Sequence, residues 1–198
     1  PRYAVPNGQN NPNLGPELTS EYEFGLDLRM FNGRFGIDIA YYDRTTEDQI
    51  FSVPASAATG YTSKILNAGE MRNYGVEFQV NVVPIETEDF QWNITLNALR
   101  QNNEVVSLAD GVESIARGGT WAADLRIAEG LPYMAIFGQD YVFNENGERL
   151  VDEDGFYQFT SERVFLGSAV ADWTGGLQTG FRYKGLFGSV LFDFQKGG

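Results

Sequence analysis

The sequence contains no cysteine and no histidine among its 198 residues. Without cysteine there is no disulfide framework and no thiolate metal site, and without histidine the commonest general base and metal ligand are missing. Basic residues are also scarce, because 14 of them stand against 27 acidic residues and give a net charge of −13. Such an acidic chain is not expected to bind nucleic acid.

Long apolar runs are absent as well. No segment approaches the roughly 20 consecutive apolar residues of a membrane helix, and the mean hydropathy is mildly negative at −0.28. The first residues, Pro1 to Ala4, do not carry the apolar segment of a secretion signal. We therefore expect either a chain that is not exported or an internal piece of a longer protein.

The sequence is rich instead in segments that alternate apolar and polar residues. Between Glu21 and Asp43 every second residue is apolar, and Asn32-Gly33 interrupts the alternation at its midpoint. Strict alternation predicts a strand, and Asn-Gly between two alternating runs is the strongest short signal for a hairpin. We predict a hairpin over about residues 20–44 in which Met30 faces Phe35 and each apolar residue meets another.

Two further hairpins are predicted over about residues 71–99 and 173–195, with reversals at about 84–89 and at Lys184-Gly185. The connections within hairpins are short, whereas those between hairpins, about 45–70 and 100–172, are long. All short turns then lie at one end of the sheet and all long loops at the other. Outer-membrane barrels have this asymmetry, with short periplasmic turns and long extracellular loops.

The apolar face of the alternating segments carries no charge within the predicted strands, and its residue types change in a regular order along the strands. We expect aliphatic residues to contact lipid at its centre: Leu26, Leu28, Ile37, Ile39, Ile94, Leu96, Leu177 and Val190. We expect aromatic residues to form girdles at its two ends: Tyr22, Tyr41, Phe90, Trp92, Trp173 and Tyr183. Aromatic girdles around an aliphatic band are typical of a transmembrane barrel.

A soluble β-sandwich that binds carbohydrate or mediates adhesion is the alternative, since its strands also alternate. The uncharged face, the girdles and the one-sided loops favour the barrel. On the opposite face we expect charged residues to line the lumen: Asp27, Arg29, Asp38, Arg72, Glu77 and Arg182. The sequence thus predicts an all-β fold, an up-and-down antiparallel barrel segment of about six strands.

The segment of about 100–172 lacks the alternation, and residues 101–172 hold 13 acidic and 4 basic residues. A structureless loop this long is uncommon, so we expect order here, including a small hairpin around Asn146-Gly147. The candidates for ligand binding are its aromatic residues, which suit either sugar rings and partner surfaces or packing of the loop itself: Trp121, Tyr133, Phe137 and Tyr141.

No residue is expected to be catalytic. Glu86, Glu88 and Asp89 lie together in a turn, where a solvated turn is a simpler interpretation than the paired carboxylates of a hydrolase. The acidic stretches 144–147 and 152–155 do not fit the spacing of an EF-hand calcium loop. A loosely bound Ca²⁺ at these acidic loops is left open, and no other cofactor is expected.

Several short motifs resemble those of one family of transporters. They are NPNLGPE at 11–17, EYEFGLD at 21–27, YYDRTTEDQI at 41–50, ATGY at 58–61, NAGE at 67–70, NYGVE at 73–77 and DWTGG at 172–176. Together they resemble the barrel of SusC/RagA-type TonB-dependent transporters over almost the whole chain. Gly15 stands where a lysine is usual in that family, which is a change in a loop.

The resemblance implies a barrel of roughly 22 strands in the outer membrane of a Gram-negative bacterium of Bacteroidetes type. It implies import of oligosaccharides or peptides, energised through TonB, with a SusD-like surface lipoprotein as partner. This sequence contains neither the plug domain nor the TonB box of the family, so it is interpreted as part of the C-terminal half of the barrel. A siderophore-type TonB-dependent receptor without a lipoprotein lid is the alternative within the membrane class.

Overall fold

The computed structural model describes residues 7–198, and the chain divides into two compact units. The sheet unit comprises Thr19–Thr46, Arg72–Asn103 and Ala171–Gly198. The loop unit comprises the residues up to Leu18 together with Glu47–Met71 and Glu104–Val170. Among the described residues no helix is long and apolar enough to cross a membrane.

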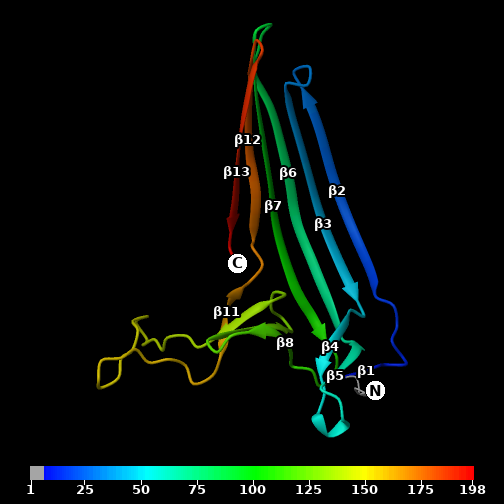
Figure 1. The fold of residues 1–198 in the computed structure, drawn as a ribbon, viewed down its shortest axis with the longest axis vertical. Coiled ribbons are helices and arrows are strands. Elements are labelled where there is room, and N and C mark those ends of the chain that lie inside the picture. The colour runs from blue at the N-terminus through cyan, green and yellow to red at the C-terminus, as the bar shows by residue number, and fades with distance from the viewer. Residues whose placement is uncertain (1–6) are drawn as a thin grey trace, which may run out of the picture. The chain divides into compact units, whose positions relative to one another are not determined.

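Six long strands form a single sheet, as the alternation predicts. They are β2 (Leu18–Met30), β3 (Phe35–Glu47), β6 (Gly69–Glu86), β7 (Phe90–Leu108), β12 (Trp173–Tyr183) and β13 (Leu186–Lys196). Their order in the sheet is β13-β12-β7-β6-β3-β2, so the two strands of each hairpin are neighbours (Figure 1). The prediction of an all-β, up-and-down fold is confirmed, and the sheet does not close on itself within this chain.

The two-residue turns lie where the sequence places them. Arg34 donates its backbone N–H to the carbonyl of Phe31 across Asn32-Gly33 at 3.2 Å. Asn32 and Gly33 have φ values of 56° and 85°, the left-handed conformation that a type I′ hairpin turn requires, and Phe31 before them is left-handed as well, with a φ of 53°. In the hairpin of β12 and β13, Tyr183 pairs with Leu186 across Lys184-Gly185. The last paired residues therefore fix the register of each ladder.

The strands extend further than the apolar alternation. The alternation in the sequence stops near residue 99, whereas β7 continues to Leu108 and its last residues belong to the loop unit. The extension, from Gln101 to Leu108, is largely polar. A ladder of backbone hydrogen bonds needs no apolar face, so a strand can continue after its apolar pattern has ended.

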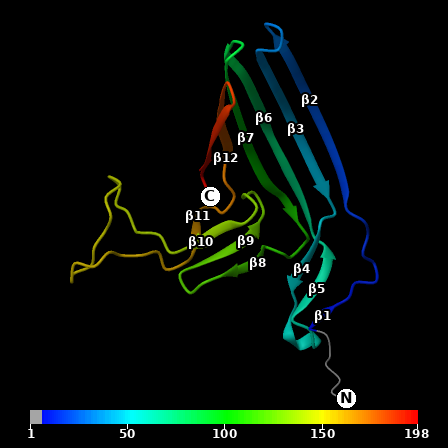
Figure 2. The same ribbon diagram turned by 45° about the horizontal axis from the view of Figure 1, so that its top comes forward.

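The loop unit contains two small sheets. The first has the order β1-β5-β4 and comprises β1 (Gly8–Gln9), β4 (Ile50–Pro54) and β5 (Ser63–Asn67), with the short 3-10 helix η1 (Ala57–Thr59) between β4 and β5. The second has the order β11-β10-β9-β8 and comprises β8 (Ser114–Gly119), β9 (Ala123–Ala128), β10 (Ala135–Gly138) and β11 (Val164–Ser168). β1 pairs with β5 in parallel, whereas the other described strand pairs of the loop unit are antiparallel. Both sheets can be followed in Figure 2.

A compact apolar core holds the loop unit together. It consists of Phe51, Val53, Ala68, Met71, Val105, Ile115 and Ile127. Each of these side chains is at most 6 % exposed, so the cluster excludes water although the surrounding segments are strongly acidic. The segment of about 100–172 is thus ordered by burial of apolar side chains that come from distant parts of the chain.

Residues 139–163, which we call the arm, fold back on themselves between β10 and β11. Phe143 bridges to Arg149, which confirms the small hairpin predicted around Asn146-Gly147. Tyr157 bridges to Val151 and Phe159 bridges to Tyr141, so a third segment packs against the first two. The arm is therefore a narrow three-segment ladder instead of an open loop.

The same turn occurs twice in the arm. Asn144 accepts the backbone N–H groups of Asn146 and Glu148 at 2.9 Å each. Asp152 accepts those of Asp154 and Phe156 at 3.0 and 2.8 Å. Asx side chains that accept backbone N–H groups in this way stabilise tight turns, and the two turns are spaced eight residues apart.

One glycine of β12 offers a test of the close contact between neighbouring strands. A Cβ added at Gly175 lies 2.4 Å from the carbonyl oxygen of Asn97 and 2.6 Å from the ring of Phe194. We expect Gly175→Ala to lower the free energy of unfolding by about 1–3 kcal/mol, because the backbone and the ring must both shift. Urea unfolding of the protein in detergent micelles measures this loss.

Gly25→Ala is the matched control in β2. A Cβ there meets only the carbonyl oxygen of Ile39 at 3.8 Å, an ordinary contact. An equal loss of stability in the two variants would contradict the role of close packing at Gly175.

Candidate functional site: the faces of the sheet and the loop unit

The printed register of three strands arranges the apolar face in cross-strand rows. From the turn end onward the rows are Phe90–Tyr183–Leu186, Trp92–Phe181–Gly188, Ile94–Thr179–Val190, Leu96–Leu177–Phe192, Ala98–Gly175–Phe194 and Arg100–Trp173–Lys196. The first five rows contain no charged side chain, and the sixth contains two. Four aromatic residues lie in the first two rows, whereas Phe192, Phe194 and Trp173 lie in the fourth, fifth and sixth rows. This composition follows directly from the alternation in the sequence.

The residues predicted to face lipid lie on this sheet, and none belongs to the apolar core. Leu26 is 53 % exposed and Val190 is 49 % exposed. Leu28, Ile39 and Leu177 are also exposed, and Ile37, Ile94 and Leu96 are half-buried. An exposed apolar surface of this extent marks a contact with a membrane or another protein. Contact with lipid itself stays a prediction.

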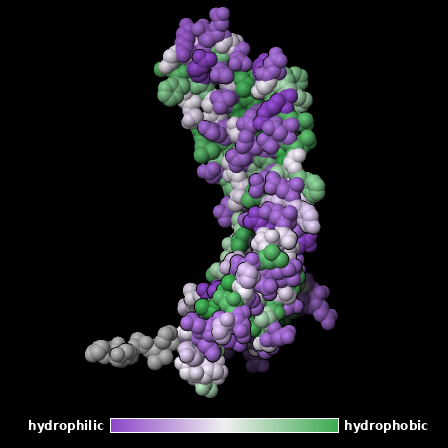
Figure 3. All heavy atoms as spheres, turned by 90° about the vertical axis from the view of Figure 1, so that its right-hand side faces the viewer, coloured by the Kyte–Doolittle hydropathy of each residue, from purple (hydrophilic) through white to green (hydrophobic). Residues whose placement is uncertain are grey.

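The predicted girdle residues lie on the same sheet. Tyr22, Tyr41, Trp92 and Tyr183 are exposed, and Phe90 and Trp173 are half-buried. Trp92 donates its indole N–H to the hydroxyl of Thr179 in the neighbouring strand at 2.8 Å. In Figure 3 the sheet unit carries hydrophilic side chains over the middle of the view and hydrophobic ones along its margins.

The opposite face is polar, and its charges are partly paired. Arg29 lies 3.1 Å from a carboxylate oxygen of Asp27 and 3.6 Å from one of Asp38. The arginine thus relieves the repulsion that two facing carboxylates of neighbouring strands would otherwise have. Arg44 donates to both carboxylate oxygens of Glu21 at 3.0 and 2.9 Å.

Two open grooves follow this polar face within the sheet unit. The first has a volume of 590 Å³, and its lining includes Asp38, Glu77, Asn97, Thr174 and Asp193. The second has a volume of 550 Å³, and its lining includes Glu21, Tyr42, Arg44, Asn73 and Gln101. Amide, hydroxyl and carboxylate groups line both grooves beside a smaller number of apolar side chains, so the grooves suit water and hydrogen-bonding solutes.

Arg72 is a correction to the predicted set of lumen-facing residues. It donates to the two carboxylate oxygens of Asp43 at 2.9 and 2.5 Å, and its guanidinium lies 4.9 Å from the ring centroid of Tyr74. The hydroxyl of Tyr41 also contacts Asp43, at 3.4 Å. Arg72 and Tyr74 are two residues apart in β6 and therefore lie on the same face of the sheet, which is the apolar one.

The four aromatic candidates of the loop unit do not form a single platform. Tyr133 packs against the apolar core, and Phe137 meets Phe165 edge to face with ring centroids 6.2 Å apart. Tyr141 lies within the arm between Tyr157 and Phe159, with centroids 5.3 and 5.0 Å away. For these three residues the packing interpretation fits the structure better than ligand binding.

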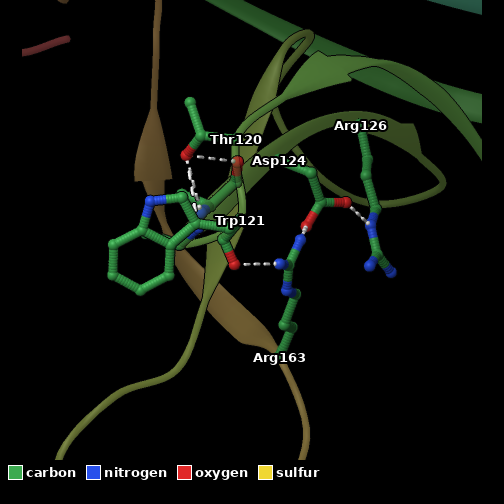
Figure 4. A network of polar contacts seen from close by, with 7 residues as sticks. Thr120, Trp121, Asp124, Arg126 and Arg163 are labelled. Carbon is green, nitrogen blue, oxygen red and sulfur yellow. Dashed lines mark hydrogen bonds and ion pairs between the residues drawn. The ribbon is translucent and has the colours of Figure 1, made fainter.

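Trp121 is different, because its side chain is 93 % exposed while its backbone is held in place. Arg163 donates to the carbonyl oxygen of Trp121 at 2.7 Å and also pairs with Asp124 (Figure 4). Asp124 in turn pairs with Arg126 in the same strand. Figure 4 shows the indole pointing away from these three charged groups. A fixed backbone with a free indole is a good arrangement for stacking against a ring or a partner surface.

The central carboxylate of this network is electrostatically stabilised. The hydrogen bond from Arg126 is the largest cause that lowers the pKa of Asp124; partial burial opposes it, and the hydrogen bond from Arg163 adds to it. The alternation of Asp124 and Arg126 in β9 could be seen in the sequence. Arg163 lies 39 residues away, so the network as a whole could not be predicted.

The acidic stretches of the arm do not form a metal cluster. Among residues 7–198 no group of three or more acidic side chains is placed to hold a metal ion. The Oδ1 atom of Asp152 accepts two backbone N–H groups of its own turn, so that atom already has partners. A loosely bound Ca²⁺ stays an untested prediction.

The ion pairs of Asp124 make the loop unit sensitive to acid. Since the folded state lowers the pKa of Asp124, the carboxylate stabilises the fold above its ordinary pKa of about 4, and this stabilisation is lost as the pH falls through the lowered value. We expect Asp124→Asn to destabilise β9 and β11 by about 1–3 kcal/mol at neutral pH. Amide hydrogen exchange, compared between the two proteins at each pH, measures the difference, which should shrink in acid.

Arg29→Gln is a second test, on the exposed polar face. The Arg29 side chain is 50 % exposed, so we expect a loss of less than about 1 kcal/mol in the free energy of unfolding. A loss above this value would show that Asp27 and Asp38 repel each other more strongly than solvent-screened charges do. Arg182→Gln, on the same face and without an ion pair among the described residues, is the control.

These features define a class of protein. An up-and-down antiparallel sheet that is apolar along most of one face, polar and grooved on the other, and joined by short turns at one end is a strip of barrel wall.

Comparisons with known proteins agree. The family model described as TonB dependent receptor-like, beta-barrel, matches residues 1–196. The chain is 30 % identical over 199 residues to the TonB-dependent receptor SusC of Bacteroides thetaiotaomicron, in an alignment that covers 93 % of the chain and 19 % of the relative. It is 29 % identical over 211 residues to the TonB-dependent receptor P3 of Formosa agariphila, in an alignment that covers 95 % of the chain and 21 % of the relative.

Solved structures are similar as well. The structure of the RagAB peptide transporter superposes with a TM-score of 0.75 at 26 % identity, covering 94 % of this chain and 22 % of the other. The chain belongs to the TonB-dependent receptor β-barrel family, whose members are outer-membrane proteins of Gram-negative bacteria. It spans about a fifth of the length of the curated relatives that it matches.

Proposed function

We propose that this chain is part of the barrel of an outer-membrane importer of the SusC/RagA type. The observation that carries the proposal is the exposed apolar face of the sheet, in which the first five rows of β7, β12 and β13 hold no charge. The chain that forms this sheet belongs to the TonB-dependent receptor barrel family. In this role the apolar face contacts hydrocarbon and the polar face borders the lumen, where the plug of the complete protein lies. Energy is relayed through TonB to a part of the protein outside this chain.

The long connections, about 45–70 and 100–172, are proposed to be extracellular loops. The short turns at Asn32-Gly33 and Lys184-Gly185 lie at one end of the strands, so the long connections leave from the other end. Trp121, in the second of these connections, presents an exposed indole beside the ion pairs of Asp124. A SusD-like surface lipoprotein is the proposed partner of this region.

The proposed cargo is a peptide or an oligosaccharide. The solved relative with a TM-score of 0.75 is a peptide transporter, which supports a peptide. The relative SusC supports the SusC-type group as a whole. The acidic character of residues 101–172 disfavours polyanionic cargo. A siderophore-type receptor without a lipoprotein is the second candidate, and no contact in the described residues favours it specifically.

The experiment that tests the proposal uses the full-length protein in its native membrane. We expect the protein to require detergent for extraction and to co-purify with a surface lipoprotein. Deletion of TonB should abolish uptake of the cargo while the protein stays in the membrane. A protein that is soluble and monomeric without detergent contradicts the barrel, whereas a receptor purified alone from mild detergent favours the siderophore-type candidate.

Trp121→Ala tests the contact role of the loop unit. Since the indole is 93 % exposed, its removal should leave the stability unchanged. We expect the affinity for cargo or lipoprotein to fall about tenfold, the equivalent of losing one stacking contact of about 1.4 kcal/mol. Isothermal titration with the purified partner or cargo measures the change.

Phe156→Ala is the matched control for Trp121→Ala. Phe156 is 71 % exposed and lies in the arm of the same unit. Equal affinities of the wild-type protein and Trp121→Ala would remove Trp121 from the contact surface.

A further inference from the structure

The sixth row of the apolar face differs from the other five. Arg100, Trp173 and Lys196 are direct cross-strand partners in β7, β12 and β13. The guanidinium of Arg100 lies 5.6 Å from the ring centroid of Trp173. Arg100 and Lys196 are exposed, and Trp173 is half-buried between them. The row therefore presents two cations on either side of an indole.

Neither cation has an anionic partner in the described part of the chain. The ion pairs of residues 7–198 involve other basic side chains, and neither Arg100 nor Lys196 takes part in one. Arg72 provides the contrast, because it lies on the same face and is neutralised by Asp43. Among the six rows that β7, β12 and β13 form on this face, only the row of Arg100, Trp173 and Lys196 carries charge, and that charge is positive.

The position of the row along the strands is informative. Phe90 and Arg100 are ten residues apart in β7, which corresponds to about 33 Å along the strand. With the usual tilt of about 40° this gives about 25 Å across a bilayer, the height of the apolar band of a barrel. The cationic row then lies where hydrocarbon ends and the lipid headgroups begin.

We infer that Arg100, Trp173 and Lys196 bind the phosphate of an anionic membrane lipid, whose acyl chains lie along the apolar rows below. This inference rests on the proposed function, because it requires the apolar face to contact a bilayer. Arginine and lysine donate charge-assisted hydrogen bonds to phosphate oxygens, and tryptophan favours the interfacial depth. Basic side chains at this depth attract anionic lipids.

Two observations favour a lipid over a soluble anion as the occupant. The row is continuous with an apolar surface on one side, formed by Ala98, Gly175 and Phe194 of the preceding row. A phosphate alone would leave this surface in water, whereas the acyl chains of a lipid cover it. Arg100 and Lys196 have no carboxylate partner within the described residues, so their positive charge is complementary to the negative charge of a lipid phosphate.

The test uses the full-length protein reconstituted into vesicles of phosphatidylcholine mixed with phosphatidylglycerol, followed by native mass spectrometry in mild detergent. We expect the wild-type protein to retain phosphatidylglycerol preferentially. The double variant Arg100→Gln with Lys196→Gln should retain roughly 10- to 30-fold less phosphatidylglycerol. Each basic side chain near the membrane surface raises the affinity for an anionic lipid about fivefold. Inorganic phosphate should not displace the lipid.

Arg182→Gln is the control, because it removes a positive charge from the polar face of the same sheet and should not change retention. Equal retention of the two lipids by the wild-type protein, or unchanged retention by the double variant, overturns the inference. Displacement by inorganic phosphate overturns the choice of a lipid. Flotation with vesicles of phosphatidylcholine alone separates the two proposals. If the protein floats but shows no preference for phosphatidylglycerol, only this inference is wrong. If the protein does not float, the barrel is contradicted as well.

Discussion

The cross-strand register of the sheet is the constraint on which the other features depend. Successive side chains of a strand point to opposite faces, so a slip of one residue between β7 and β12 would bring Gln178 and Arg182 into the apolar rows. The paired order Leu96–Leu177–Phe192 shows that this slip has not occurred. The grooves of the polar face and the uncharged rows of the other face are both consequences of one register.

The sheet could be predicted from the sequence because the patterns that indicate its strands and turns are local. Alternation and the Asn-Gly turn act between near neighbours, and they identify the strands, the turns and the residues that share a face. The misplacement of Arg72 came from expecting charge to avoid the apolar face. Its neutralising partner Asp43 comes from another strand, and the pairing of the two strands at that height depends on contacts between distant residues.

The loop unit shows where such reasoning ends. The short strands β8 to β11 carry no long alternation, and the core brings Phe51 together with Ile115 and Ile127 across more than sixty residues of sequence. Tyr133, Phe137 and Tyr141 look like ligand platforms in the sequence, but the structure uses their rings for packing. Trp121 alone among the four candidates combines an exposed ring with a fixed backbone, which the local turn at Thr120 and the distant Arg163 hold together.

The paired Asx turns of the arm have a consequence for what holds this surface in shape. Asn144 and Asp152 begin equivalent turns eight residues apart, and each turn is closed by its own side chain. The hydrogen bonds that close the turns come from residues of the arm and not from β10 or β11. The arm thus carries within its own short sequence the side chains that reverse its chain.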